Sequence, residues 1–419
     1  RRARRADAMT PRARTSIAPR AVLFAIFLGA LAALAPISID MALPALVEIG
    51  ASLHASSSRT GLTLSLFMAG FAIGPIVYGP LSDARGRKPV LLLGLAFFTS
   101  GGVLATLAPG VGVLLVARFI QGLGAGAGMT IALAIVRDRF DGAAMQRRIA
   151  AITVVANVAP IVAPSIGVAL LSTVHWRGLY ALMAGCGLLA ACVTWIGLRE
   201  SAPGTGTRLS LPLLGRGYAT VFGHRGIVTS ILLNGLGFGW MFAYVAGSPL
   251  VLEQLLHVSP AVYAGMFALT GAGIVAGASC NAFVVGRGVS SPRVLAVAVV
   301  LATLSTAALL GLGVLRWISL ASVMPLLVVS TFCFGLAAPS AARGALEPLP
   351  ALAGVTGGLL TSVQMLIGAV SSSLVAFLFP AMGMSAMSGV MAGCAVLALL
   401  VLLSAGTVAR HDHDHDHDR

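Results

Sequence analysis

Long apolar stretches alternate with short polar connections along nearly the whole 419-residue chain. A helix needs roughly 20 apolar residues to cross a bilayer core about 30 Å thick. Lipid offers the backbone no hydrogen-bond partners, and a helix satisfies its backbone N–H and C=O groups within the segment itself. The pattern predicts an all-α integral membrane protein with 12 transmembrane helices, at 21–46, 60–80, 89–108, 111–136, 149–172, 176–198, 226–250, 260–286, 293–315, 317–342, 352–379 and 384–406.

The longest polar-leaning connection divides these spans into two groups of six. It contains Gly, Pro and Ser and lies where a boundary between two halves is expected. A degenerate echo of the loop after the second span, GRGVSSPRVLAVA, begins at Gly286 and indicates an internal repeat. We therefore predict an N-terminal tail (1–20), an N-terminal six-helix bundle (21–198), a central linker (199–225), a C-terminal six-helix bundle (226–406) and a His/Asp tail (407–419).

Composition excludes a soluble protein, because only 10% of residues are charged and 58% are hydrophobic, with a mean hydropathy of +0.97. The net charge of +14 does not indicate a nucleic-acid partner, since the basic residues form short clusters between apolar spans. Lys and Arg concentrate in loops on the cytoplasmic side. Only Arg59, Arg177 and Arg316 fall in loops of the other side, so both termini are expected in the cytoplasm, with membrane lipids around the spans.

Two ionisable residues, Asp40 and Arg118, lie within the predicted spans. Such residues are expensive in a membrane and are functional candidates. At 1.5 Å per residue both fall in the outer third of the bilayer, where they could meet or share a hydrated cavity. We predict that Asp40 is a site that binds at most one proton and that Arg118 tunes its proton affinity. The alternatives are a structural ion pair, or an Asp40 that simply lies in the interface.

The loop between the second and third spans reads GPLSDARGRKP and resembles the signature loop of the major facilitator superfamily. Ala84 stands where the family often has Arg. The resemblance implies a gate on the cytoplasmic side, in which the acid pairs with neighbouring basic residues and with the N-terminus of the eleventh span. An anion at a helix N-terminus is favourable. The implied gate residues are Gly79, Asp83, Gly86, Arg87 and Lys88.

Three further stretches are similar to motifs of drug exporters. APISIDMALPAL, beginning at Ala35, resembles the first span of the bacterial Bcr/CflA drug-resistance subfamily, with Ala42 in place of an aromatic residue. LLVARFIQGLGAGAG resembles a motif whose Arg is linked to proton transfer. Its glycines are better explained by helix packing than by dinucleotide binding. ANVAPIVAPSIGVAL resembles a motif of exporters, carried here by Pro160, Pro164 and Gly167.

Polar and aromatic residues near the middle of the spans are candidates for a substrate cavity, although each is also explained by packing. As a group they predict a mostly apolar cavity with few fixed donors, which suits a small amphipathic drug better than a sugar. The candidates are Met41, Gln121, Asn157, Asn234, Trp240, Tyr244 and Gln364.

These observations and the resemblance predict a monomeric antiporter of the bacterial inner membrane, which exports a small, largely apolar or amphipathic drug by rocking-bundle alternating access. The proton gradient supplies the energy, and no cofactor or metal is expected. The alternatives are an exporter or proton symporter of a small metabolite and, more remotely, a receptor or scaffold. An enzyme is not expected, because the loop histidines His54, His175, His224 and His257 stand singly. The run HDHDHDHD is expected to be a solvated tail, with weak metal binding as the alternative.

Overall fold

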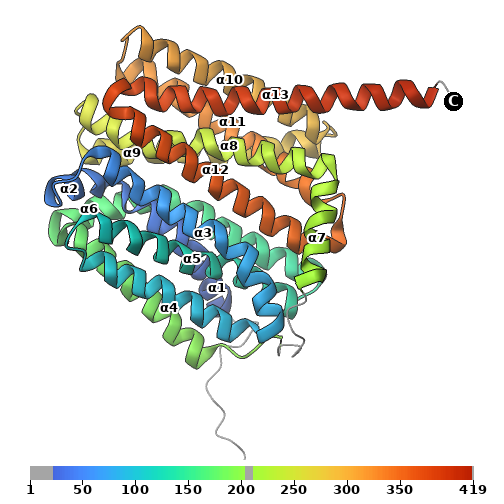
Figure 1. Ribbon diagram of the computed structural model, residues 1–419, viewed down its shortest axis with the longest axis horizontal. Coiled ribbons are helices and arrows are strands. Elements are labelled where there is room, and N and C mark those ends of the chain that lie inside the picture. Colours follow the sequence, from blue (N-terminus) through green and yellow to red (C-terminus); the bar gives the residue numbers. More distant parts are fainter. Residues whose placement is uncertain (1–21, 203–210, 418–419) are drawn as a thin grey trace, which may run out of the picture.

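The computed structural model describes residues 22–202 and 211–417, and the described chain is almost entirely helical, without strands (Figure 1). The elements before the central linker are α1 (Val22–Asp40), the 3₁₀ turn η1 (Leu43–Ala45), α2 (Leu46–Ser52), α3 (Ser57–Arg85), α4 (Arg87–Thr106), α5 (Val111–Arg139) and α6 (Gly142–Gly197).

The linker contributes one short helix, and the second half then follows the order of the first. Its elements are α7 (Leu211–Gly223), α8 (Arg225–Pro249), the π-helix η2 (Leu250–Leu255), α9 (Pro260–Gly286), α10 (Ser291–Val314), α11 (Leu320–Leu346), the 3₁₀ turn η3 (Pro350–Leu352), α12 (Ala353–Met382) and α13 (Met384–His417).

Eleven helical segments of the described chain are long and apolar enough to cross a membrane. The number is eleven because α6, with 56 residues, contains two of the predicted spans and breaks at His175, where φ is 56°. Its first part packs on α1, where Val155 lies against Gly29, and its second part packs on α4, where Gly187 lies against Phe98. The predicted all-helical membrane fold is therefore confirmed, with two spans continuous in α6.

Several helix ends differ from those predicted. A 3₁₀ turn at Leu43–Ala45, which contains Pro44, follows α1, and α2 then carries the chain to Ser52, beyond the expected end at 46. The seventh span continues through η2 to Leu255 instead of ending at 250. The last helix runs on to His417, where a separate tail was expected, since neither Gly nor Pro interrupts 407–417. The domain bounds stay a prediction, and the tail 1–20 lies outside the described residues.

Glycines allow equivalent helices of the two halves to pack at backbone distance. In the first half, a Cβ on Gly122 of α5 would lie 1.9 Å from the carbonyl oxygen of Phe67 in α3. In the second half, a Cβ on Gly335 of α11 would lie 2.0 Å from the carbonyl oxygen of Ile274 in α9. The same close contact thus occurs twice, as an internal repeat requires, and small residues are what such contacts need.

The two halves meet through α3 with α12 and through α6 with α9. We call the end of the bundle that carries α7 and residues 199–202 the linker end, and the other the opposite end (Figure 1). At the opposite end the chain turns through four non-glycine residues with positive φ: His54, His175, His257 and Arg316. These turns are short, because a single left-handed residue ends each helix there.

Candidate functional site

A cavity of about 1230 Å³ lies between the two halves and extends from the linker end to the middle of the bundle. Its wall is mainly apolar, with aromatic side chains such as Phe71, Phe238 and Phe334. Asp83 lines it at the linker end and is two-thirds exposed there, so the cavity reaches solvent at this end. The structure is therefore open towards the linker end.

The Asp40 carboxylate forms the inner end of this cavity, at the last residue of α1. The side chain is almost buried, with an exposed fraction of 5% for the residue. In the described part of the chain, neither a hydrogen bond nor an ion pair reaches its oxygens. Tyr244 of α8 lines the same cavity. An acid without a fixed cation can exchange a proton or bind a cationic group.

Arg118 lies in α5 and is fully buried, with an exposed fraction of 1%. Its Nη2 donates to the backbone carbonyl of Ser38 at 3.0 Å, and its Nη1 donates to Oε1 of Gln121 at 2.6 Å. The guanidinium also stacks on the rings of Phe67 and Tyr180, at 4.3 and 5.5 Å from the ring centroids.

The sequence left open whether Asp40 and Arg118 meet, and in this structure they form no ion pair. Arg118 holds the backbone two residues before Asp40 instead, and it is absent from the lining of the cavity. Arg118 therefore positions the segment that carries Asp40, while the carboxylate itself faces the cavity.

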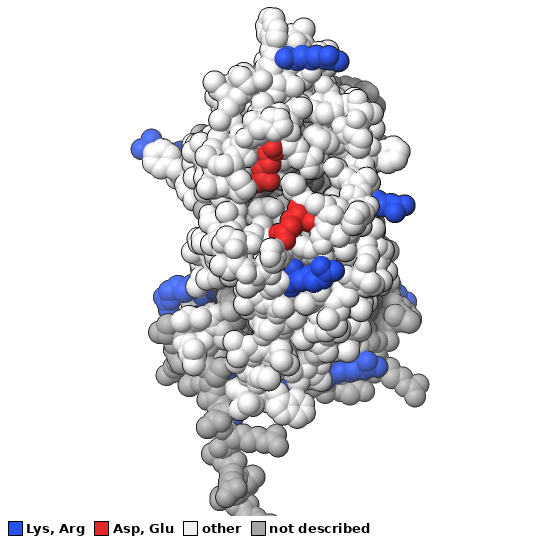
Figure 2. All heavy atoms as spheres, turned by 90° about the vertical axis from the view of Figure 1, so that its left-hand side faces the viewer, with Lys and Arg blue, Asp and Glu red and all other residues white. Residues whose placement is uncertain are grey.

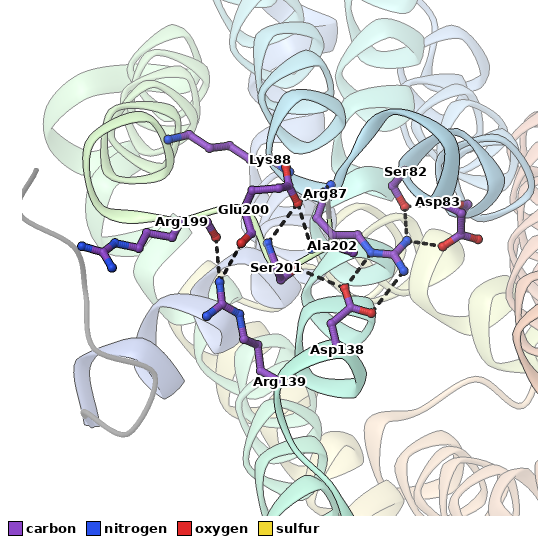
Figure 3. A network of polar contacts seen from close by, with 11 residues as sticks. Ser82, Asp83, Arg87, Lys88, Asp138, Arg139, Arg199, Glu200, Ser201 and Ala202 are labelled. Atoms are coloured by element: carbon purple, nitrogen blue, oxygen red, sulfur yellow. Dashed lines mark hydrogen bonds and ion pairs between the residues drawn. The ribbon is translucent and has the colours of Figure 1, made fainter. Parts of the chain in front are cut away.

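The predicted gate residues form a polar network centred on Arg87 at the linker end (Figure 3). The Arg87 guanidinium pairs with Asp83, and it donates to Oγ of Ser82 at 2.7 Å. It also donates to both carboxylate oxygens of Asp138 in α5, at 2.8 and 3.3 Å. The expected pairing of Asp83 with a neighbouring basic residue is present. The expected contact with the eleventh span is not, because in the described residues no hydrogen bond or ion pair joins Asp83 to α12.

A third acid, Glu200, caps the N-terminus of α4. Its carboxylate accepts hydrogen bonds from the backbone N–H groups of Arg87 at 2.8 Å and Lys88 at 3.0 Å (Figure 3). Gly86, with φ of 96°, lets the chain turn between α3 and α4 beneath this carboxylate. A Cβ on Gly86 would lie 2.7 Å from Glu200, so this glycine is needed both for backbone conformation and for space.

Asp138 and Glu200 were not among the predicted site residues. Asp138 stands alone between two arginines at the end of α5, and Glu200 follows the last apolar residues of α6. The sequence signal that could have identified them is an acidic residue at a helix end on the side of the membrane that is rich in Lys and Arg.

The exporter-like motif lies in the first part of α6. Pro160 lines the cavity, and Pro164 lies one turn further along the same helix. A Cβ on Gly167 would lie 2.5 Å from the carbonyl oxygen of Met41, so the glycine permits α6 to pack on the segment after Asp40. The motif therefore supports the same segment that Arg118 holds from the other side.

Of the predicted cavity residues, Tyr244 and Gln364 line the cavity. The side chain of Asn157 lies outside the described part of the structure, although Ala156 and Val158 beside it line the cavity. Four others are buried away from the lining, for packing or pairing reasons: Met41, Gln121 (paired with Arg118), Asn234 (donating to the carbonyl of Ala338 at 3.4 Å) and Trp240.

Comparison with known proteins finds relatives across most of the chain. Residues 28–372 match the sequence model of the Major Facilitator Superfamily. The chain is 32% identical to the uncharacterized MFS-type transporter YdgK of Bacillus subtilis over 84% of this chain and 88% of that one. It is 28% identical to a bicyclomycin resistance protein homolog of Haemophilus influenzae, over 84% and 89% of the two chains. It is also 28% identical to the multidrug resistance protein MdtL of Salmonella agona, over 91% and 96%.

Solved structures share the fold at lower identity. The crystal structure of a D-xylose–proton symporter matches with a TM-score of 0.70 and 15% identity, over 91% of this chain and 97% of that one. The structure of the human organic anion transporter MFSD10 matches with a TM-score of 0.63 and 21% identity, over 91% and 98%.

Proposed function

The chain belongs to the major facilitator superfamily, and from that premise we propose that it exports a small, largely apolar or amphipathic drug in exchange for a proton. It is a multi-pass membrane transporter of small molecules, not an enzyme. The names of two relatives, a bicyclomycin resistance homolog and a multidrug resistance protein, support a drug as the substrate.

The observation that carries this proposal is the Asp40 carboxylate at the inner end of a large apolar cavity. An apolar wall with few fixed donors accepts ligands of varied shape and binds sugars poorly. Among the described residues no cation pairs with this carboxylate, so a proton and a cationic or hydrogen-bonding drug compete for one place. Competition of this kind couples the two movements, because the carboxylate must release one partner before it binds the other.

The gate residues give the cycle its two states. In the observed state the linker end is open, and Asp83 and the N-terminal residues Ala353 and Gly354 of α12 line the same cavity. Tilting the halves together at this end brings the Asp83 carboxylate towards the N-terminus of α12. The N–H groups there favour an anion, so closure gains an interaction that the open state lacks. The drug and the proton thus meet Asp40 from opposite sides in turn.

We further propose that the linker end faces the cytoplasm of a bacterial inner membrane. In the described part of the chain the basic residues of the loops concentrate at this end, while Arg59, Arg177 and Arg316 are the exceptions at the other. A cavity open to the cytoplasm is where an exporter collects its substrate, and the monomer contains both halves of that cavity.

The test is drug-triggered proton movement in inside-out vesicles, with a panel of antibiotics and the Asp40→Asn variant. We expect at least one compound to dissipate the proton gradient with the parent protein but not with Asp40→Asn. The matched control is Asp141→Asn, an exposed acid at the linker end, which should couple as the parent does. Equal coupling by Asp40→Asn would refute the proton site, and a compound that enters with protons would instead indicate symport.

A further inference from the structure

The cavity has a charged mouth at the linker end. Four ionisable residues line it there: Asp83, Arg87, Arg137 and Asp138. A largely apolar molecule that enters from water passes these side chains and strips water from them, which costs free energy. The mouth therefore suits polar solutes, although the wall behind it is apolar.

The opposite end is closed to this cavity in the described structure. The lining stops at Asp40 and includes neither Glu48 nor Glu253, the acids of that end in the described chain. Figure 2 views this end, where uncharged side chains cover most of the surface and two acidic side chains lie near the middle of the face. In this state a drug must come from the linker end or from the side.

One of the two seams between the halves is closed from the side. Along α3 and α12, a Cβ on Gly368 would overlap the Cε of Met68. A Cβ on Gly358 would lie 3.3 Å from the carbonyl oxygen of Pro75. The two glycines are separated by about 15 Å along α12. Contact this close over such a length leaves no passage for a drug between α3 and α12.

The other seam, between α6 and α9, differs because residues that line the cavity there are also exposed. Val154 and Val158 of α6 have exposed fractions of 60% and 46%. Val275 of α9 has an exposed fraction of 44%. Lining the cavity does not by itself expose a valine, since Val245 of α8 lines it too and is 1% exposed. The wall between α6 and α9 is therefore open on a second side.

The exposed residues form one stripe on each helix. Val154 and Val158 are four positions apart and share a face of α6. Val275, Ser279 and Ala282, at intervals of four and three, share a face of α9, and all three line the cavity. At 1.5 Å per residue, the stripe on α9 lies about 6 to 16 Å from the linker end of that helix. With a bilayer core about 30 Å thick, this is the depth of the lipid tails in the leaflet on the linker side.

We propose that the drug enters sideways from this leaflet, through a portal between α6 and α9 that is bordered by the two stripes. The inference rests on the proposed function and narrows its substrate class to compounds that concentrate in the membrane. Apolar groups partition from water into lipid, so the bilayer gathers such a compound beside the cavity. On this route the compound meets small, uncharged side chains and avoids the charged mouth.

The first test asks whether the stripes border lipid and the water-filled cavity at once. Nitroxide labels are placed at positions 158 and 275 of the full chain in proteoliposomes, without drug. We expect both labels to collide with O₂, which concentrates in lipid, and also with a water-soluble nickel chelate. A label at position 370 of α12, which is exposed but does not line the cavity, should meet mainly O₂. A label at position 133 of α5, which lines the cavity and is half-buried, should meet mainly the chelate.

Two results of this test would overturn the inference. Labels at 158 and 275 that meet O₂ alone indicate a lipid-facing wall sealed from the cavity. Labels that meet the chelate alone indicate a cavity wall sealed from lipid. Neither measurement involves a drug, a proton or Asp40, so the portal is decided even if the proposed antiport fails.

The second test narrows the portal with the double variant Val154→Trp, Ser279→Trp. The readout is proton movement triggered by the compound that the vesicle assay identifies, at low and at saturating concentration. We expect kcat/KM to fall by about tenfold, within the range over which association rates vary among variants of one site. The value of kcat should stay close to that of the parent, because entry is not limiting at saturation.

The matched control is Val370→Trp, which adds the same ring to an exposed valine of α12 outside the cavity. It should leave both constants unchanged. A parental kcat/KM in the double variant would overturn entry through the portal, and so would an equal loss in Val370→Trp. Parental coupling by Asp40→Asn, together with a low kcat/KM in the double variant, would instead place the failure in the proposed proton site.

Discussion

Ser65 in α3 and Ser372 in α12 share a buried hydrogen bond, with their hydroxyl oxygens 2.9 Å apart. This bond joins the two halves of the transporter near the opposite end. One turn away on each helix, a Cβ on Gly61 would lie 2.7 Å from the Cβ of Ala376. The halves are thus in direct contact at the end that is closed in this state.

Gly61→Val should weaken that closed contact. Overpacking a tight site costs typically about 1–3 kcal/mol, which shifts the equilibrium towards the state with the opposite end open. We expect spin labels at positions 47 and 262, exposed on the two halves of this end, to move apart. Gly265→Val, at a glycine of α9 with open space around it, is the control and should leave the distance unchanged. Unchanged distances in Gly61→Val would contradict the closed contact.

Arg118→Lys should lower both stability and transport although it keeps the charge. Lysine cannot hold the Ser38 carbonyl and the Gln121 amide together as the guanidinium does. A hydrogen bond to a charged group is worth about 1.5–3 kcal/mol. We expect a lower melting temperature of the purified protein and at least about tenfold slower drug-triggered proton movement. Parental transport in Arg118→Lys would show that positive charge alone is required.

Asp138→Asn and Asp83→Asn should differ in their effect on the thermal stability of the observed, linker-end-open state. Asp138 is largely buried against Arg87, with a side-chain exposure of 18%, whereas Asp83 is 67% exposed. Exposed ion pairs contribute about 0–1 kcal/mol, so Asp83→Asn should hardly change thermal stability. Asp138→Asn should lower it by about 1.5–3 kcal/mol. Asp83→Asn should still slow transport, because its carboxylate is needed when the linker end closes. Equal stability losses would contradict this division.

Glu200→Gln should loosen the N-terminus of α4. The carboxylate caps two backbone N–H groups, and a negative charge at a helix N-terminus is worth about 0.3–1 kcal/mol, more when partly buried. We expect faster amide exchange at Arg87 and Lys88 and a modest fall in melting temperature. Glu347→Gln, an exposed acid at the end of α11, serves as the control and should change neither. Unaltered exchange in Glu200→Gln would refute the capping role.

The sequence predicted the helices well because apolar length is a strong local signal. It missed helix ends where proline was expected to end the span. At Pro44 the chain instead forms a 3₁₀ turn, and after Pro249 it continues as a π-helix. A hydropathy pattern also cannot predict that two spans join in one helical element at His175, because a single residue with positive φ takes the place of a polar loop there.

The site was predicted in part. Asp40 and the gate residues were found because charges within or beside apolar spans stand out. The partners of those charges were harder to find, since Asp138 and Glu200 meet Arg87 only through tertiary packing. Arg118 illustrates the same limit: spacing put it at the depth of Asp40, but the guanidinium turned to a backbone carbonyl that no sequence pattern marks.

The short turns of the opposite end determine which motions the molecule can make. His54, His175, His257 and Arg316 each reverse the chain with one left-handed residue, and consecutive helices are tied together within a few residues. A connection of that length is too short to let one helix slide along its neighbour by one helical turn, about 5.4 Å. Each half must therefore move as a rigid body. A small rotation about the contact between Ser65 and Ser372 then produces a large displacement of the gate residues at the linker end.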